Sequence, residues 1–243
     1  MILLLDVGNT RIKWGCHDGH KWLGQGVLPT TEPDRLAAVL TDWRPAWVGI
    51  ACVAGPAVGE AIEKRLADTP RHWLTSAETG HGLANRYDRP ETLGVDRYAA
   101  LLACARMGLA PCVVASAGTA LTADALAGDG VFLGGMIAPG VGLMRLALAR
   151  GTAGVGAASG AVQVFPRSTA DAVESGIRAA LVGVVETLRG DLAARLGDPV
   201  KVVLTGGDAD WLAEGLAGPV VIERNLVLEG LLWLARDLGK SAA

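Results

Sequence analysis

The chain has 243 residues, 51% hydrophobic and 19% charged, so it can bury a sizeable core and is not expected to be disordered. Its net charge of -3 gives no basic surface for a nucleic-acid partner. The N-terminus lacks the basic segment of a signal peptide, and no apolar stretch reaches the roughly 20 residues of a membrane span. The four cysteines form no C-x-x-C pair. Together these features predict a soluble cytoplasmic protein without a membrane or nucleic-acid partner.

The first part of the chain predicts three short strands followed by alternating helices and strands, with turn residues between the strands. The expected elements are strands Ile2–Leu5, Arg11–Cys16 and Lys21–Val27, helix Pro33–Trp43, strand Ala46–Cys52, helix Ala57–Ala67 and strand His72–Leu74. A polar stretch from Thr75 to Thr92 follows, which is either a linker or a substrate loop. A helix is expected from Val95 to Met107.

The same pattern begins again near Cys112. The expected elements are strands Cys112–Ser116, Ala120–Ala125 and Val131–Ile137, helices Gly142–Ala149 and Thr169–Leu196, strand Lys201–Thr205, helix Trp211–Leu216, strand Val220–Ile222 and helix Leu226–Asp237. Such a repeat indicates two similar halves that face each other across a ligand cleft. We expect residues 1–92 to form a phosphate-binding half and residues 93–243 to form a half with substrate and nucleotide contacts.

The first expected strand runs into a turn whose residues suit an anion. Gly8 allows backbone amides to approach a phosphate, Thr10 adds a hydroxyl donor, and Lys13 adds positive charge on the next strand. Asp6 stands where a carboxylate can hold a hydrated Mg²⁺. An ordinary hairpin uses the same turn residues, so this motif alone leaves both readings open.

Gly118 and Thr119 occupy the equivalent turn of the second half, where backbone amides and a hydroxyl can hold a second phosphate. A plain hairpin is the simpler reading of this turn by itself. The two turns together favour one nucleotide triphosphate held from both sides. The chain has no G-x-x-x-x-G-K-[ST] motif, which excludes a P-loop kinase.

The helix expected from Val95 begins with charged residues after Gly94. Its first-turn amides favour an anion. Asp96 is the best candidate general base of the chain, and Arg97 beside it can fix a carboxylate or a phosphate. A helix start with a charge pair is the alternative interpretation.

Four motifs in this order resemble the type III pantothenate kinase family. They are D-x-G-N-T-x-x-K at Asp6–Lys13, Y-x-x-P-x-x-L-G-x-D-R at Tyr87–Arg97, G-T-A-x-T-x-D at Gly118–Asp124 and G-G-x-I-x-P-G at Gly134–Gly140. The resemblance extends from Met1 to about Gly230. It implies an α/β fold of two ribonuclease-H-like halves, of β-β-β-α-β-α-β type, flanking a cleft. The acetate kinase, sugar kinase, Hsp70 and actin superfamily has this fold.

The resemblance implies ATP with Mg²⁺ as cofactors, pantothenate as substrate and a homodimer whose interface comes mainly from the second half. It assigns ATP binding to Thr119 and to the whole first loop, that is Asp6, Val7, Gly8, Asn9, Thr10, Arg11, Ile12 and Lys13. Asp6 would hold Mg²⁺ through water. Pantothenate would contact Tyr87, Gly94, Val95, Asp96, Arg97 and Thr169, with Asp96 as the catalytic base on the primary hydroxyl.

Ser116 departs from the family pattern, in which an aspartate at this position helps to bind K⁺ or NH₄⁺. A hydroxyl is a neutral ligand and holds a monovalent cation more weakly than a carboxylate. Weaker activity and another group that fills the site are both open consequences. Two other functions stay open as well, namely a kinase for another small alcohol and a non-catalytic regulatory relative.

Overall fold

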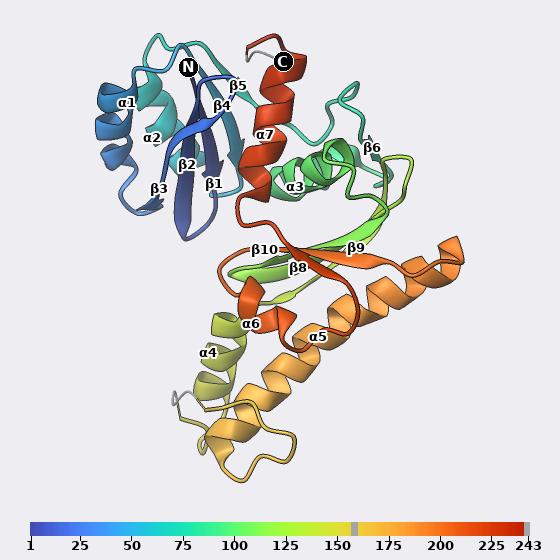
Figure 1. The fold of residues 1–243 in the computed structure, drawn as a ribbon. Helices are drawn as coiled ribbons and strands as arrows, with labels where there is room; N and C mark the ends of the chain where they lie inside the picture. The colour runs from blue at the N-terminus through green and yellow to red at the C-terminus, as the bar shows by residue number, and fades with distance from the viewer. Residues whose placement is uncertain (157–159, 241–243) are drawn as a thin grey trace. The chain divides into compact units, whose positions relative to one another are not determined.

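The computed structural model describes residues 1–156 and 160–240 and divides the chain into two compact units. Unit 1 joins Met1–Gly108 to the segment that starts at Asn225, and unit 2 is Leu109–Arg224 (Figure 1). Packing therefore groups the helix that begins at Val95 with the N-terminal strands. The predicted boundary after residue 92 was drawn from function and stays a prediction.

Unit 1 is built on a five-stranded sheet in the order β3-β2-β1-β4-β5. Its strands are β1 Ile2–Val7, β2 Arg11–His17, β3 Trp22–Pro29, β4 Trp47–Cys52 and β5 Arg71–Trp73. The central strand β1 runs antiparallel to β2 and parallel to β4. Both β1 and β4 are nearly continuous apolar runs, as expected of strands that are covered on both faces.

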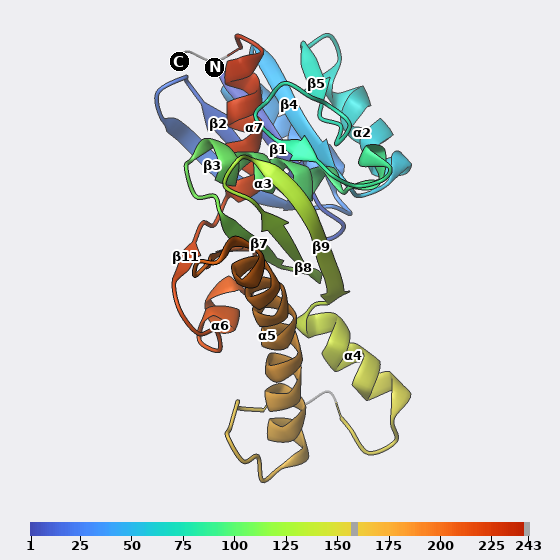
Figure 2. The same ribbon diagram turned by 90° about the vertical axis from the view of Figure 1, so that its right-hand side faces the viewer.

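The two faces of this sheet are covered by different helices. The remaining elements of unit 1 are η1 Pro33–Arg35, α1 Leu36–Trp43, α2 Pro56–Leu66, β6 Ala84–Asn85, η2 Pro90–Thr92, α3 Val95–Arg106 and α7 Leu226–Asp237. Leu3, Leu5 and Val7 of β1 share one core cluster with residues of α1 and α2. Since side chains alternate along a strand, Leu4 and Asp6 point to the opposite face, where α3 and α7 pack on β1 and β4 (Figures 1 and 2).

Helices α3 and α7 approach each other closely at Gly230. A Cβ atom at this position would lie 2.0 Å from the carbonyl oxygen of Ala99, so only glycine fits here. Along α3, every residue from Arg97 to Cys104 is buried. The contact at Gly230 therefore fixes α3, and the polar residues at its start, to the rest of unit 1.

The sheet of unit 2 runs β11-β10-β7-β8-β9, which repeats the order of unit 1. The elements of this unit are β7 Cys112–Ala117, β8 Ala120–Leu126, β9 Val131–Pro139, α4 Val141–Gly151, α5 Thr169–Leu196, β10 Lys201–Thr205, α6 Ala209–Ala213 and β11 Val220–Ile222. Ser168 caps the N-terminus of the long helix α5, and its hydroxyl accepts a hydrogen bond from the backbone N–H of Asp171. It packs Ile177, Leu181 and Val185 on the sheet (Figure 2).

The predicted duplication is confirmed. In both units the first strand pairs antiparallel with the second and parallel with the fourth. The predicted elements are present, with ends that shift by a few residues, and the sequence missed the short elements β6 and η2 in the polar stretch after β5. In the described residues, no helix is both long and apolar enough to cross a membrane.

We predict that Gly230→Ala destabilises the protein by about 1–3 kcal/mol, because the new methyl group would force α7 away from α3. Urea unfolding followed by circular dichroism measures the loss. Gly183→Ala is the matched control, since Gly183 lies within α5 and a Cβ there meets nothing within 4 Å. Equal stability of the two variants would contradict this account of the α3–α7 contact.

Candidate active site

Asp6 and Lys13 lie side by side at the end of the first hairpin of unit 1. They are register partners of β1 and β2, so their side chains point to the same face of the sheet. This is the face that α3 and α7 cover. The half-buried carboxylate of Asp6 thus has one ammonium group as its near neighbour along the sheet.

The turn between β1 and β2 is closed by its own backbone and held from outside by Thr30. The N–H of Gly8 donates to the carbonyl of Arg11 at 3.0 Å. The hydroxyl of Thr30 donates to the carbonyl of Gly8 at 2.7 Å, and its N–H donates to the carbonyl of Thr10 at 3.2 Å. No motif in the sequence indicated this role of Thr30, which lies just after β3.

The predicted phosphate-binding segment contains two kinds of residue. Val7 and Ile12 are fully buried in the apolar core, so only their backbone can serve a ligand. Asn9, Thr10 and Arg11 are exposed at the tip of the turn. The exposed end of this turn is therefore polar, and the strand residues that flank it belong to the apolar core. The assignment of this segment to ATP binding stays a prediction.

Two carboxylates interact on the covered face of unit 1. Burial raises the pKa of Asp6 from 3.8 to about 6; Lys13 opposes this shift, and the negative charge of Asp96 adds to it. The side-chain carboxylate of Asp6 accepts no hydrogen bond from the part of the chain that the structure describes. A single desolvated carboxylate of this kind fits a cation such as Mg²⁺ that keeps most of its waters.

The start of α3 presents Asp96 and Arg97. Gly94 is the N-cap residue, and a Cβ there would lie 2.6 Å from Oδ1 of Asp96, so glycine leaves room for the carboxylate. Oδ1 of Asp96 accepts a hydrogen bond from the N–H of Arg97 at 2.8 Å. Burial raises the pKa of Asp96, and this hydrogen bond opposes the shift.

Tyr87, in the loop before α3, contacts Arg97 at the start of this helix. Its hydroxyl accepts a hydrogen bond from Nη1 of Arg97 at 3.1 Å, and the guanidinium carbon lies 5.7 Å from the centre of its ring. Unit 1 therefore brings together Asp6, Lys13, Asp96, Arg97 and Tyr87, which the sequence had placed in two separate motifs. Gly94 and Val95 belong to the same helix start.

The predicted second phosphate turn lies between β7 and β8 of unit 2. The N–H of Gly118 donates to the carbonyl of Ala120, and the N–H of Gly140 donates to the carbonyl of Thr119 at 3.0 Å. A Cβ at Gly140 or Gly206 would lie 2.1 or 2.2 Å from a carbonyl oxygen of residues 117–118. Close backbone approach from both sides thus shapes the turn and leaves Thr119 exposed.

Ser116 occupies the place in β7 that Asp6 holds in β1. Its register partners are Thr122 on β8 and Thr205 on β10, so hydroxyl groups stand in a row on the sheet face opposite α5. The hydroxyl of Thr205 donates to the carbonyl of Arg224 at 3.2 Å. Neutral hydroxyl oxygens in this row would hold a monovalent cation more weakly than a carboxylate does, and a cation site here stays a prediction.

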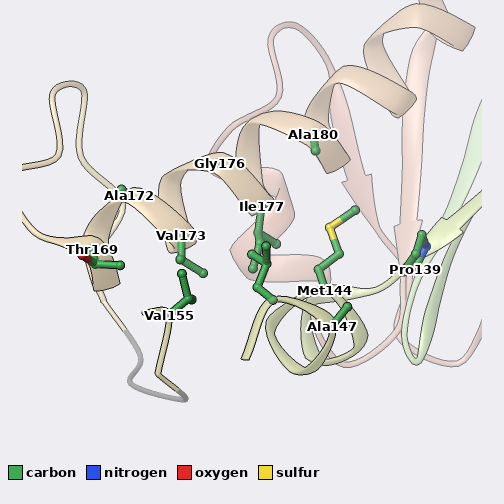
Figure 3. Close-up of a pocket in the computed structure, with 11 residues that line it drawn as sticks. Pro139, Met144, Ala147, Val155, Thr169, Ala172, Val173, Gly176, Ile177 and Ala180 are labelled. Carbon is green, nitrogen blue, oxygen red and sulfur yellow. The ribbon is translucent and has the colours of Figure 1, made fainter. Parts of the chain in front are cut away.

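Thr169 lies apart from the turn at Thr119. It lines an apolar groove of about 570 Å³ between α4 and α5, at the end opposite Pro139 (Figure 3). Among the described residues that line the groove, Thr169 carries the one polar side chain. Neither Asp6 nor Asp96 nor Thr119 contributes to the groove, so it is an apolar surface rather than the site of phosphoryl transfer.

Comparison with known proteins identifies the family. The model of the type III pantothenate kinase family matches residues 2–190. A type III pantothenate kinase of Dechloromonas aromatica is 43% identical over 97% of this chain and 99% of its own. The chain belongs to the type III pantothenate kinase family. The enzyme of that name from Nitrosospira multiformis is 39% identical and matches 100% of this chain and 94% of its own.

Solved structures confirm the predicted fold class. A Campylobacter jejuni protein, named as a Baf family transcriptional activator, matches with a TM-score of 0.66 at 20% identity over 98% of both chains. An N-acetylmannosamine kinase-like protein of Listeria monocytogenes matches with a TM-score of 0.56 at 14% identity over 97% of this chain and 99% of its own. At these identities the likeness concerns the fold alone, an α/β fold of two similar halves.

We predict that Asp6→Asn makes stability less dependent on pH. Because the pKa of Asp6 is raised to about 6 on folding, the folded protein binds more protons than the unfolded one between about pH 4 and 6, and stability falls as the pH rises through this range. At pH 7.5 the variant should be more stable by up to about 3 kcal/mol, and the difference should vanish below about pH 3.

Urea unfolding of the nucleotide-free protein measures this difference. Asp18→Asn is the control with the opposite sign, since backbone hydrogen bonds lower the pKa of Asp18, and its contribution is lost as the pH falls. If Asp6→Asn raises the free energy of unfolding by the same amount at every pH, desolvation of this carboxylate is not the cause of the gain in stability.

Proposed function

We propose that this chain transfers the γ-phosphoryl group of ATP to pantothenate. The product is 4′-phosphopantothenate, at the first step of coenzyme A biosynthesis. Membership of the family supports this proposal. Within unit 1 it is carried by one observation, the interaction of the Asp6 carboxylate of the first turn with the Asp96 carboxylate at the start of α3. A phosphate loop and a general base on one face are what phosphoryl transfer to an alcohol requires.

The first turn binds the phosphate end of the nucleotide. Its exposed backbone, the hydroxyl of Thr10 and the ammonium group of Lys13 offer donors and positive charge to the phosphate oxygens. Asp6 would hold Mg²⁺ through water, and the ion would supply positive charge against the triphosphate. Thr119 is assigned as a second phosphate contact because its turn repeats the first one in topology.

Asp96 acts on the acceptor. The primary hydroxyl oxygen of pantothenate attacks the γ-phosphorus in line with the bond to the β-phosphate bridging oxygen, that bond breaks to release ADP, and the hydroxyl proton passes to Asp96. The N–H of Arg97 orients the Asp96 carboxylate. Arg97 and Tyr87 hold pantothenate, and Thr169 is a further predicted contact. Positioning and electrostatics supply most of the acceleration.

We propose that the monovalent cation expected from the family, K⁺ or NH₄⁺, is held more weakly here than by the carboxylate of the family pattern. Ser116, Thr122 and Thr205 supply only neutral hydroxyl oxygens in the row where the family pattern has a carboxylate. No step of the proposed reaction passes through such an ion. The predicted cytoplasmic location stays a prediction.

The proposed assembly is a homodimer through the α4–α5 side of unit 2. Leu143 and Leu146 of α4 are exposed, and Val164 and Phe165 of the segment before α5 are 87% and 85% exposed. The apolar groove lies between the same helix α4 and helix α5, which follows the segment of Val164 and Phe165. An apolar surface of this kind is typical of an interface between subunits.

Two other functions stay open, a kinase for another small alcohol and a regulatory relative without catalysis. The likeness to the Campylobacter jejuni protein shows the fold alone. The presence of Asp6, Lys13, Asp96 and Arg97 together in unit 1 favours catalysis. A screen of small alcohols by ADP release separates the first alternative from the proposed reaction.

We predict that Asp96→Asn lowers kcat by about 10²–10⁴-fold, the usual contribution of a general base, while nucleotide affinity changes little. Wild-type kcat should fall at acidic pH as Asp96 becomes protonated, at a pKa above its ordinary value. ADP release with pantothenate as acceptor measures both effects. Near-normal turnover of folded Asp96→Asn would refute the role of this carboxylate.

We predict that Phe165→Glu converts the dimer into a monomer, because it places a charge on the exposed apolar surface of unit 2. Light scattering coupled to size-exclusion chromatography gives the mass. Val27→Glu is the control, because Val27 is 56% exposed on β3 of unit 1. A monomeric wild type, or a dimer that survives Phe165→Glu, would exclude this interface.

A further inference from the structure

The loop that carries Tyr87 depends on side chains for its shape. It connects β5 to α3 and contains only two short regular elements, the two-residue strand β6 and the 3-10 turn η2. A long loop with so little backbone pairing needs other groups to satisfy its amides and carbonyls. The side chain of Asn85 supplies most of these bonds at the point where the two ends of the loop approach each other.

The amide of Asn85 bonds to backbone groups of three separate residues. Its Nδ2 donates to the carbonyl of Ser76 at 3.2 Å and to the carbonyl of Pro90 at 3.0 Å. Its Oδ1 accepts from the N–H of Tyr87 at 3.0 Å. Both donors and one acceptor position of the amide are therefore used inside the loop. The buried hydroxyl of Ser76 adds a bond to the same Pro90 carbonyl at 2.9 Å.

The bond from Asn85 to Tyr87 leads directly to the acceptor side of the site. It fixes the backbone of Tyr87, whose hydroxyl accepts from Arg97 at 3.1 Å and whose ring lies beside the Arg97 guanidinium. The N–H of Arg97 in turn orients the carboxylate of Asp96. A displaced loop would therefore move Tyr87 away from the guanidinium of Arg97, while the turn between β1 and β2 would keep its own hydrogen bonds.

We infer that Asn85 is a positioning residue of the acceptor site, which holds Tyr87 against Arg97 so that both can engage pantothenate. This inference rests on the proposed function. Its chemistry is specific to an amide, because an aspartate at this position keeps the acceptor for Tyr87 but sets a negative oxygen against the carbonyls of Ser76 and Pro90. The loop would then open where Asn85 joins Ser76 to Pro90, although the volume of the side chain at position 85 is nearly unchanged.

The test compares Asn85→Asp with the wild type in steady-state kinetics. We expect KM for pantothenate to rise at least 10-fold, kcat to fall less than KM rises, and nucleotide affinity by titration to stay within about twofold. Asn225→Asp is the charge-matched control; its side chain bonds Gln25, whose amide can turn to donate instead, so both constants should stay at wild-type values. Asn85→Ser deletes the amide without adding charge and should also raise KM for pantothenate. It replaces Asn85→Asp as the test if Asn85→Asp does not fold.

A double-mutant cycle separates positioning from general stability. If Asn85 acts through Tyr87, Asn85→Asp should raise KM much less in a Tyr87→Phe background than in the wild type. The inference would be overturned if KM for pantothenate stays unchanged in the Asn85 variants, or if the effects of Asn85→Asp and Tyr87→Phe on KM are fully additive. A loss of nucleotide affinity as large as the rise in KM would also overturn it. A folded wild type that binds nucleotide but does not phosphorylate pantothenate would instead refute the proposed function.

Discussion

The position of one carboxylate, Asp6, constrains the rest of the site. Side chains alternate along β1, so the residues that build the core with α1 and α2 leave Asp6 on the face that α3 and α7 cover. There the carboxylate loses water, and this desolvation together with the charge of Asp96 raises its pKa to about 6 against the opposing charge of Lys13. A desolvated carboxylate is costly to a folded protein unless a cation offsets it, which is the condition that a metal-bound triphosphate meets.

Keeping Asp96 near Asp6 requires residues from the start, the middle and the end of the chain. The helix that carries Asp96 packs on α7, and this contact depends on a glycine at position 230. The loop before α3 is closed by Asn85, and the first turn is closed by Thr30. Each of these residues acts on the site through the backbone of another. Substitutions that loosen these contacts would therefore displace Asp96 or its neighbours, even though the substituted residue lies far from Asp96 in the sequence.

The sequence predicted what depends on local pattern. Apolar runs and turn residues gave the strands, their recurrence gave the duplicated fold, and the motif around Asp6 gave the first turn. It could not predict the approach of Asp6 and Asp96, nor the roles of Thr30, Asn85 and Gly230, because these depend on contacts between residues that are distant in the chain. The departure at Ser116 was visible in the sequence, but only the strand register showed that Thr122 and Thr205 flank it with further hydroxyls.

The most direct test of this arrangement is a carboxyl NMR titration of the nucleotide-free protein. In the wild type, the account predicts that Asp6 titrates near pH 6, and that its pKa falls in Asp96→Asn because a neighbouring negative charge has been removed. An Asp6 carboxyl that titrates near its ordinary value of 3.8, or one whose pKa is the same in both proteins, would contradict the claim that these two carboxylates share one buried face.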